Sequence, residues 1–361
     1  MRLAMSSNKP KLTKLVAATL FGVALVFSLF IASNGEHGDK EKELYWPSPP
    51  DPPRIKYVRS IASPRDLKLK QSSFLKRVVK KIIGTEDPEP AMMSPYGIVT
   101  DSRQRIIAVD SKARMIHVFD PQEKKYVAIR APKKEMFVSL VGVAVDGQDN
   151  IYVSDSYTGK IFIFDRNGKL IKRIGSEEGS FNRPTGIAID KASRRLYVVE
   201  TVKGEVDVLD LDGIGLFKFG KRGEGQGEFN HPTQICVSGD SVYVTDTLNA
   251  RIQVFDKDGH FISVVGRHGD GIGDLDKPKG VAIDSHGHIY VVEGLRDRVQ
   301  IFDKEGNLLL VFGETGSDRG EFYLPTAIHI DADDNIYISD SSNRRIQVFR
   351  YLRTPGAAIR D

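Results

Sequence analysis

Six acidic residues recur at an almost constant interval between residues 110 and 340 of this 361-residue chain. They are Asp110, Asp155, Glu200, Asp246, Glu293 and Asp340, separated by 45, 45, 46, 47 and 47 residues. Carboxylates repeated in this way could converge and coordinate a divalent cation such as calcium, which prefers oxygen ligands. In four copies an arginine follows four or five residues later, as Arg251 follows Asp246. This pairing favours a simpler role, an ion pair that stabilises a turn.

Other residue types that perform chemistry are scattered. The eight histidines include no three at equivalent positions of the repeat, so a zinc site built from histidines is not indicated. Two glycine-rich stretches, 220–229 and 266–275, look like phosphate-binding loops. No helix pattern or Gly-Lys-Ser/Thr sequence follows either stretch, and we interpret both as connections between repeats.

The elements that position the acids are short β-strands. In the second copy they are expected over 141–146, 151–155, 160–165 and 169–175, with alternating β-branched residues and Asp-x-x-Gly turns between them. Four strands in each of six copies predict an all-β, six-bladed β-propeller over residues 92–352.

The repeat also carries a family signature. It reads "RPTGIAID" at 183–190, "KPKGVAID" at 277–284 and "NARIQVFDKDG" at 249–259. This pattern resembles the NHL repeat over about residues 92–350, whereas the only tryptophan, Trp46, lies outside the repeats and argues against a WD40 array. The resemblance implies the fold but no single activity, because propellers of this kind include scaffolds, RNA-binding proteins and, among relatives, enzymes.

The last copy lacks a fourth strand. After residue 352 the chain ends in "RTPGAAIRD", the predicted C-terminal tail 353–361. An open ring would leave unpaired strand edges. Residues 54–61, "RIKYVRSI", alternate properly, and we expect them to close the ring beside the C-terminal blade.

Candidate binding residues are those that depart from the repeat. At the start of the inner strands, near the expected channel mouth, they are Tyr96, Thr185, Thr233, Gln234, Lys279 and Thr326. In the turns between second and third strands they are Arg296 and Arg344. Cys236 and His329 also depart from their small counterparts, and we interpret them as core variation.

Charge is unevenly distributed along the chain. Residues 1–45 carry six Lys/Arg and four Asp/Glu, residues 46–91 carry ten and five, and the remaining 270 carry 36 and 39. The propeller region is therefore mildly acidic, and this charge balance argues against a nucleic-acid partner. A single cysteine excludes an intramolecular disulfide.

The N-terminal quarter is predicted to be an anchor and a spacer. Residues 15–32 carry no charge, and Arg2 and three lysines precede them, so a cytoplasmic segment 1–14 and a single transmembrane helix over 15–34 are expected. A cleaved signal peptide is the alternative. Residues 35–53 are predicted to be a charged and proline-rich spacer, and 62–91 a basic amphipathic helix with a linker, lying on lipid or on the main domain.

The expected protein is a bacterial, single-pass protein of the cytoplasmic membrane with its propeller in the periplasm or outside. Its expected function is to bind a protein, peptide or small ligand on its loop face. The alternative is a lactonase-like hydrolase or an amidating-lyase-like enzyme with a divalent metal, such as calcium, in the central channel.

Overall fold

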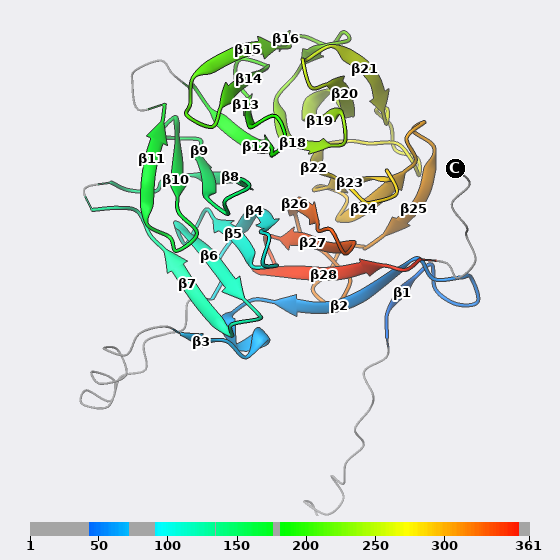
Figure 1. Ribbon diagram of the computed structural model, residues 1–361. Helices are drawn as coiled ribbons and strands as arrows, with labels where there is room; N and C mark the ends of the chain where they lie inside the picture. Colours follow the sequence, from blue (N-terminus) through cyan, green and yellow to red (C-terminus); the bar gives the residue numbers. More distant parts are fainter. Residues whose placement is uncertain (1–42, 72–90, 134, 176–180, 354–361) are drawn as a thin grey trace, which may run out of the picture. The chain divides into compact units, whose positions relative to one another are not determined.

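The computed structural model describes residues 43–71, 91–133, 135–175 and 181–353. All of the described strands belong to one compact unit, Leu44–Asp361. Its antiparallel sheets follow one another in the sequence and surround a common centre as the blades of a propeller (Figure 1). The prediction of an all-β, six-bladed propeller is confirmed.

Each blade has an inner, a second, a third and an outer strand. Blade 1 contains β4 (Pro95–Thr100), β5 (Ile106–Asp110), β6 (Met115–Asp120) and β7 (Lys125–Ile129), and blade 2 contains β8 (Leu140–Val145), β9 (Ile151–Asp155), β10 (Lys160–Phe164) and β11 (Leu170–Ile174). Blade 3 contains β12 (Pro184–Asp190), β13 (Arg195–Glu200), β14 (Glu205–Asp210) and β15 (Gly215–Phe219), and blade 4 contains β18 (Pro232–Ser238), β19 (Ser241–Asp246), β20 (Arg251–Asp256) and β21 (Phe261–Val265). Blade 5 contains β22 (Pro278–Ile283), β23 (Ile289–Glu293), β24 (Arg298–Phe302) and β25 (Leu308–Phe312), and blade 6 contains β26 (Pro325–Ile330), β27 (Asn335–Asp340) and β28 (Arg345–Tyr351).

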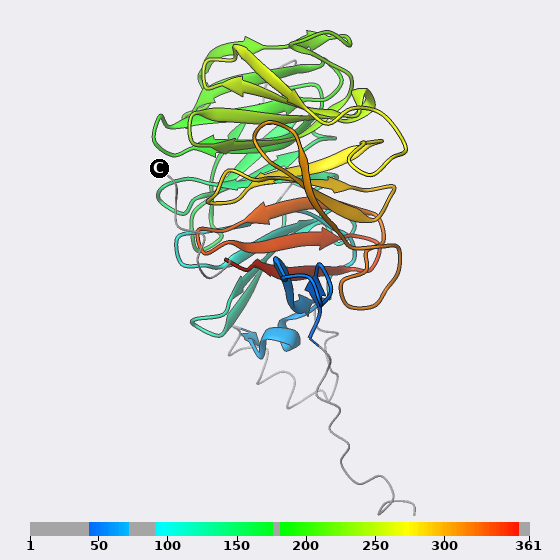
Figure 2. The ribbon, with the colours of Figure 1, turned by 90° about the vertical axis from the view of Figure 1, so that its right-hand side faces the viewer.

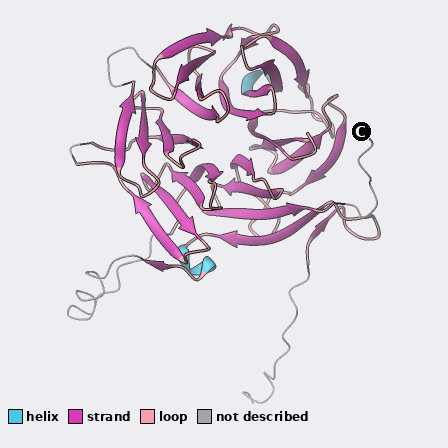
Figure 3. Cartoon of the chain, in the orientation of Figure 1, coloured by secondary structure: helices cyan, strands magenta, loops and turns pink. Residues whose placement is uncertain are grey.

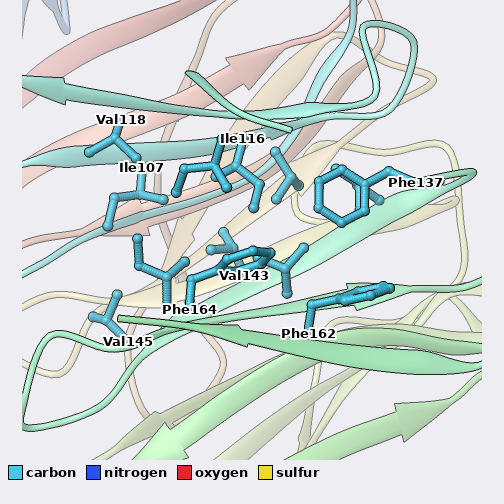
Figure 4. Packing of buried hydrophobic residues seen from close by; sticks show 13 residues of the cluster. Ile107, Ile116, Val118, Phe137, Val143, Val145, Phe162 and Phe164 are labelled. Atoms are coloured by element: carbon cyan, nitrogen blue, oxygen red, sulfur yellow. The ribbon is translucent and has the colours of Figure 1, made fainter. Parts of the chain in front are cut away.

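The hydrophobic core is divided among the seams between blades. Six clusters of buried apolar side chains each combine residues of two neighbouring blades. Between blades 1 and 2, for example, Ile107 and Ile116 pack with Val143 and Phe162 (Figure 4). A blade is therefore buried by its neighbours, which explains why the motif has to be repeated around a ring.

Glycine in the Pro-x-Gly motif allows the inner strands to approach each other closely. A β-carbon on Gly186 would lie 2.6 Å from the Cα of Gln234 in the next blade, and one on Gly97 would collide with the carbonyl oxygen of Val141. Only glycine fits at such a distance. β26 also lies against β4, so the inner strands form a closed ring.

Blade 6 takes its outer strand from the N-terminal part of the chain. The segment expected over 54–61 is β2 (Ile55–Ile61), which pairs antiparallel with β28 from Ile55 opposite Tyr351 to Ile61 opposite Ile346. The two strands lie side by side along one edge of the propeller in both views (Figures 1 and 2). This pairing covers the edge of β28 and joins the two ends of the repeat array.

The described part of the proline-rich segment is a hairpin rather than an extended spacer. β1 (Tyr45–Trp46) pairs antiparallel with β2, and the indole of Trp46 lies 5.9 Å from the ring of Phe312 and 5.7 Å from that of Phe349. The spacer prediction is wrong for residues 44–53, because aromatic packing on blades 5 and 6 overrides the extended preference of proline. Residues 35–42 lie outside the described residues.

The amphipathic helix predicted within 62–91 does not begin where expected. Residues Pro64–Leu67 form the short 3-10 helix η1, and β3 (Lys70–Gln71) pairs parallel with β7. Leu67 and Leu69 pack on the cluster between blades 6 and 1, which favours this compact path over a helix. In the described residues the only other helix is η2 (Thr247–Asn249), as Figure 3 shows.

Several N-terminal predictions fall outside the described residues. These are the cytoplasmic segment 1–14, the transmembrane helix 15–34, the rest of the amphipathic helix over 72–90 and residues 354–361 of the tail. Among the residues that the structure describes, none belongs to a helix of the length and hydropathy needed to cross a membrane.

Candidate functional site

The six repeated acids hold the connectors, the segments that link the outer strand of one blade to the inner strand of the next. Each acid is buried and accepts backbone hydrogen bonds from the connector that enters its own blade, as Asp246 does from Asn230 N (2.7 Å) and Asp155 from Val138 N (2.7 Å). In the described ranges, no three His, Cys, Asp or Glu side chains are arranged so that they could hold a metal ion. The acids therefore act in the frame of the propeller.

In blades 4, 5 and 6 the acid belongs to a larger network. Asp246 accepts hydrogen bonds from Arg251 Nε (2.8 Å) and from Gln253 Nε2 (3.1 Å). The same arginine and glutamine also donate to the carbonyl oxygen of Glu228 in the connector, at 2.9 and 2.6 Å. The Arg-x-Gln sequence of the repeat is thus a connector clamp, and its ion pair is the one that the sequence predicts.

Antiparallel strands place the loops of every blade at two opposite ends of the propeller. The connectors lie at the same end as the turns between second and third strands, and we call this end the connector face. The turns between first and second strands and those between third and fourth strands form the other end, the turn face.

Exposed apolar side chains gather on the connector face. The second residue after the repeated acid is apolar in four consecutive blades and is between 40% and 77% exposed. We call these four residues the apolar ring: Tyr157, Val202, Leu248 and Leu295. Met93, Met136, Tyr323 and Leu324 in the connectors add further exposed apolar surface at the same end.

Three of the predicted site residues are threonines that link neighbouring blades. Each hydroxyl bonds a second hydroxyl: Thr185 to Thr201 (2.8 Å), Thr233 to Thr247 (2.7 Å) and Thr326 to Ser341 (2.7 Å). These partners in turn donate to a backbone carbonyl of the next blade, at Pro232, Pro278 and Pro95. The hydroxyls of the three threonines thus have hydrogen-bond partners within the propeller itself.

Tyr96, Gln234 and Lys279 lie on the inner strands of three different blades, β4, β18 and β22. Burial raises the pKa of the Tyr96 phenol, with Arg183 opposing the shift. The Gln234 side chain folds back over Gly186 of blade 3 and lines the channel. Lys279 is half-buried, and burial, followed by the nearby Lys277, lowers the pKa of its ammonium group.

The two predicted arginines have different environments. Arg296 donates to the Gly269 carbonyl (2.7 Å) and to the Asp270 carboxylate (2.9 Å) in the connector. Asn249 and Asn343 bond connector carbonyls from the same position of the repeat, so Arg296 replaces an asparagine clamp. Arg344 is exposed at a turn position with positive φ. Only Arg344 of this pair is accessible for recognition.

A cavity of about 410 Å³ occupies the channel toward the turn face. Among its lining residues His329 Nε2 lies 2.8 Å from the hydroxyl of Thr100, and Cys236 lies in the wall. Burial lowers the pKa of His329 to about 4 and raises the pKa of the Cys236 thiol to about 11. At neutral pH both groups are uncharged, whereas Lys191, Asp284 and Asp331 add charged side chains to the lining.

The sequence contains signals for both the cavity and the apolar ring, although the sequence alone favoured core variation as the explanation of Cys236 and His329. His329 stands where the other blades carry a small residue, and its contact with Thr100 joins residues 229 positions apart, which no local pattern reveals. Of the predicted mouth residues only Gln234 lines the cavity. The apolar ring is visible in the sequence as an apolar residue two positions after four of the acids, but its exposure is a tertiary property.

Comparisons with known proteins support the fold. The chain is 32% identical over 136 residues to Protein brain tumor from Drosophila melanogaster. The matched segment is 37% of this chain and only 13% of that protein's length. Virginiamycin B lyase from Staphylococcus aureus has a TM-score of 0.54 at 14% identity, over 72% of this chain and 96% of that chain. An auxiliary nutrient binding protein from Bacteroides thetaiotaomicron has a TM-score of 0.56 at 14% identity, over 73% and 70%. At such identities these structures show similarity of fold alone.

Family membership rests on a longer match. The profile of the family described as 6-bladed beta-propeller matches residues 101–218, 224–293 and 281–352, which together exceed half of the 361 residues. The matched ranges include strands of all six blades. The chain therefore belongs to the 6-bladed beta-propeller family.

Proposed function

We propose that this protein is an NHL-type propeller that binds a protein or peptide partner on its connector face. The observation that carries this function is the apolar ring, which exposes Tyr157, Val202, Leu248 and Leu295 at one end of the propeller. Exposed apolar surface gathered in one place is typical of interaction sites on soluble domains. The identity with Protein brain tumor supports the NHL assignment.

The frame beneath the ring suits recognition by loops. The acid-centred networks and the hydroxyl pairs fix the loops to buried strands, so the ring residues are presented on a rigid support. Burying one leucine side chain at an interface contributes on the order of 2 kcal/mol, and two together can account for about a thousandfold in affinity.

The test is capture of a partner by the full-length protein and by two matched double variants. Leu248→Ser with Leu295→Ser removes two ring leucines that are 46% and 53% exposed. Leu216→Ser with Leu309→Ser removes two leucines that are 49% and 50% exposed on the outer strands β15 and β25. We expect crosslinked capture to be lost only in the ring variant, with both melting temperatures close to that of the wild type. Equal capture by both variants would contradict the proposal.

The same proposal places the propeller outside the cytoplasm, anchored by residues 15–34. Its support is the uncharged run 15–32, which follows Arg2, Lys9, Lys11 and Lys14. A reporter fused to the C-terminus should be active outside the cytoplasm and should sediment with membranes. Recovery of a soluble product trimmed near residue 35 would indicate a signal peptide instead.

A second candidate is binding or conversion of a small molecule in the channel. The cavity of about 410 Å³ with the paired His329 and Thr100 favours it. A small ligand in this cavity should become undetectable by calorimetry after His329→Phe, whereas the ring variant should bind it normally. Binding of a small molecule should therefore depend on His329 and not on the ring leucines, whereas capture of a protein partner should depend on the ring leucines.

A further inference from the structure

Cationic side chains without ion-pair partners surround the channel mouth on the connector face. In the described residues six such side chains lie beside the inner-strand starts or in the turns after the repeated acids. We call them the mouth cations: Lys112, Arg114, Arg183, Lys277, Lys279 and Arg344. Five of the six are exposed, and Lys279 is half-buried.

Acidic side chains at the same end are largely engaged by the frame. The six repeated acids are buried and bonded to connector amides. Asp297 is also buried and accepts from Leu324 N (2.7 Å) and from the Thr315 hydroxyl (2.8 Å). In the outer parts of the connectors Asp274 pairs with Arg267, at 2.7 Å. Asp276, adjacent to Lys277, is the acid nearest to the mouth cations in the sequence. The exposed connector acids Glu224, Glu314 and Asp318 precede the inner-strand prolines by seven residues or more.

Blade 5 differs from its neighbours at the innermost of these positions. Blades 3, 4 and 6 carry a hydroxyl residue after the acid and a threonine after the inner-strand proline. Blade 5 has Gly294 and Lys279 instead. A β-carbon on Gly294 would lie 2.9 Å from Lys279 Cγ and 3.8 Å from its Cε, so the absence of a side chain leaves the path for the lysine stem.

Lys279 is therefore a half-buried ammonium group beside apolar side chains. Gly294, over which its stem passes, is followed by Leu295, and the carbonyl of Pro325 in the next blade lies 3.1 Å from the same β-carbon position. Tyr323 and Leu324, both exposed, precede that proline. The lowered pKa of Lys279 agrees with an ammonium group that lacks a nearby counter-charge.

We infer that the partner of the connector face is an acidic peptide segment, with a carboxylate seated against Lys279 and adjoining apolar side chains packed on Leu295 and Leu324. This inference rests on the proposed function and specifies the chemistry of its partner. A carboxylate would replace the lost hydration of the ammonium group, and the other mouth cations would attract an acidic chain from a distance.

A peptide suits this surface better than a nucleic acid does. Val202, Leu248 and Leu295, three of the four ring residues, are aliphatic and offer no flat surface on which a base can stack, whereas Tyr157 and Tyr323 are aromatic. The repeats and tail also carry slightly more acidic than basic residues, 39 against 36 over the last 270, so this region as a whole is not basic. A backbone of phosphates would need a longer basic track.

The experiment is selection from a random dodecapeptide phage library on the full-length protein in detergent micelles. A synthetic copy of the best peptide is then measured by fluorescence anisotropy. We expect selected peptides to be enriched in Asp or Glu next to apolar residues and Lys279→Met to weaken binding about tenfold. The control Lys169→Met removes an exposed lysine from the turn face and should leave binding unchanged.

The peptide side of the contact is tested in the same assay. Replacing the key acid of the peptide by its amide should weaken binding of the wild type about tenfold and should have little further effect on Lys279→Met, because both changes remove the same pair. Raising the ionic strength should also weaken wild-type binding.

Other outcomes separate this inference from the proposed function. Neutral or basic peptides that bind Lys279→Met normally but are lost with Leu248→Ser and Leu295→Ser would overturn the acidic partner and leave the binding face intact. Failure to enrich any peptide, or binding unaffected by the ring variant, would overturn both. Tighter binding of a fluorescein-labelled oligothymidine, weakened by Lys279→Met, would replace the peptide by a nucleic acid.

Discussion

Blades 3 and 4 are neighbours with the same four-stranded topology, but the polar groups behind their connectors differ. Blade 4 uses Asp246, Arg251 and Gln253, and every member of this set bonds another member or the connector. At the same positions blade 3 carries Glu200, Glu205 and Asp207, three acids in place of one.

Blade 3 neutralises these acids with lysines from other positions. Lys218 on the outer strand lies 2.9 Å from Asp207 and 3.1 Å from Glu205, and Lys203 in the turn lies 3.7 Å from Glu200. Glu200 Oε1 is buried and has no hydrogen-bond partner, and burial raises the pKa of this carboxyl. The comparison teaches that a blade can form without the complete network of acid, arginine and glutamine, since the apolar clusters between blades bury most of its hydrophobic side chains.

The largest difference between the two blades should follow removal of the acid itself. Asp246→Ala removes the carboxylate that accepts from both Arg251 and Gln253 and leaves the amide of Asn230 without its acceptor. We expect a loss of about 3–5 kcal/mol in the free energy of unfolding, measured in urea at pH 7. Glu200→Ala should cost clearly less, because Glu200 is the more poorly compensated acid. Equal losses would remove the distinction between the blades.

A smaller difference should appear at the glutamine position. Gln253 is fully buried, and its oxygen accepts from Gly227 N (2.9 Å). Gln253→Leu leaves this connector amide unpaired and should cost about 1–3 kcal/mol. Asp207→Leu in blade 3 releases only Lys218, whose side chain is 55% exposed and can be hydrated, so its cost should stay below about 1 kcal/mol. Thermal unfolding of both variants gives the comparison.

The smallest effect should have the opposite sign in the two blades. The raised pKa of Glu200 means that its contribution to stability is complete at low pH and is lost as pH rises through the folded-state pKa. Glu200→Gln should therefore raise stability at pH 7 and have little effect below the usual pKa of a glutamate. Asp246→Asn, the same chemical change in blade 4, should lower stability at pH 7, because it weakens the pair with Arg251. Melting temperatures between pH 3.5 and 7.5 test both signs.

Much of the propeller could be predicted from the sequence because its signals are local. Strand alternation, the Asp-x-x-Gly turns and the spacing of the acids all lie within one repeat of 45–47 residues, and their recurrence reports the number of blades. The N-terminal hairpin could not be predicted in this way. Its conformation depends on Trp46 packing on Phe312 and Phe349, residues from the far end of the chain.

The candidate site was predicted in part for the same reason. Departures from the repeat identified Lys279 and Arg344, which the structure places at the mouth and on the surface of the connector face. The same criterion also selected Arg296, which is a clamp, and three threonines whose hydroxyls link blades. A departure from the repeat shows that a position differs, but not whether its side chain bonds the frame or reaches solvent.

The sequence by itself determined the all-β repeat, the number of blades and the positions of the acids, because hydrophobic alternation and turn residues act over a few neighbouring residues. Only the tertiary structure decided which of the unusual side chains remain accessible. Arg296 reaches a connector 26 or 27 residues earlier, and His329 reaches Thr100 across the junction between the last blade and the first. Contacts of this length are set by how the blades pack around the ring, and that packing depends on the shapes of all six seams together.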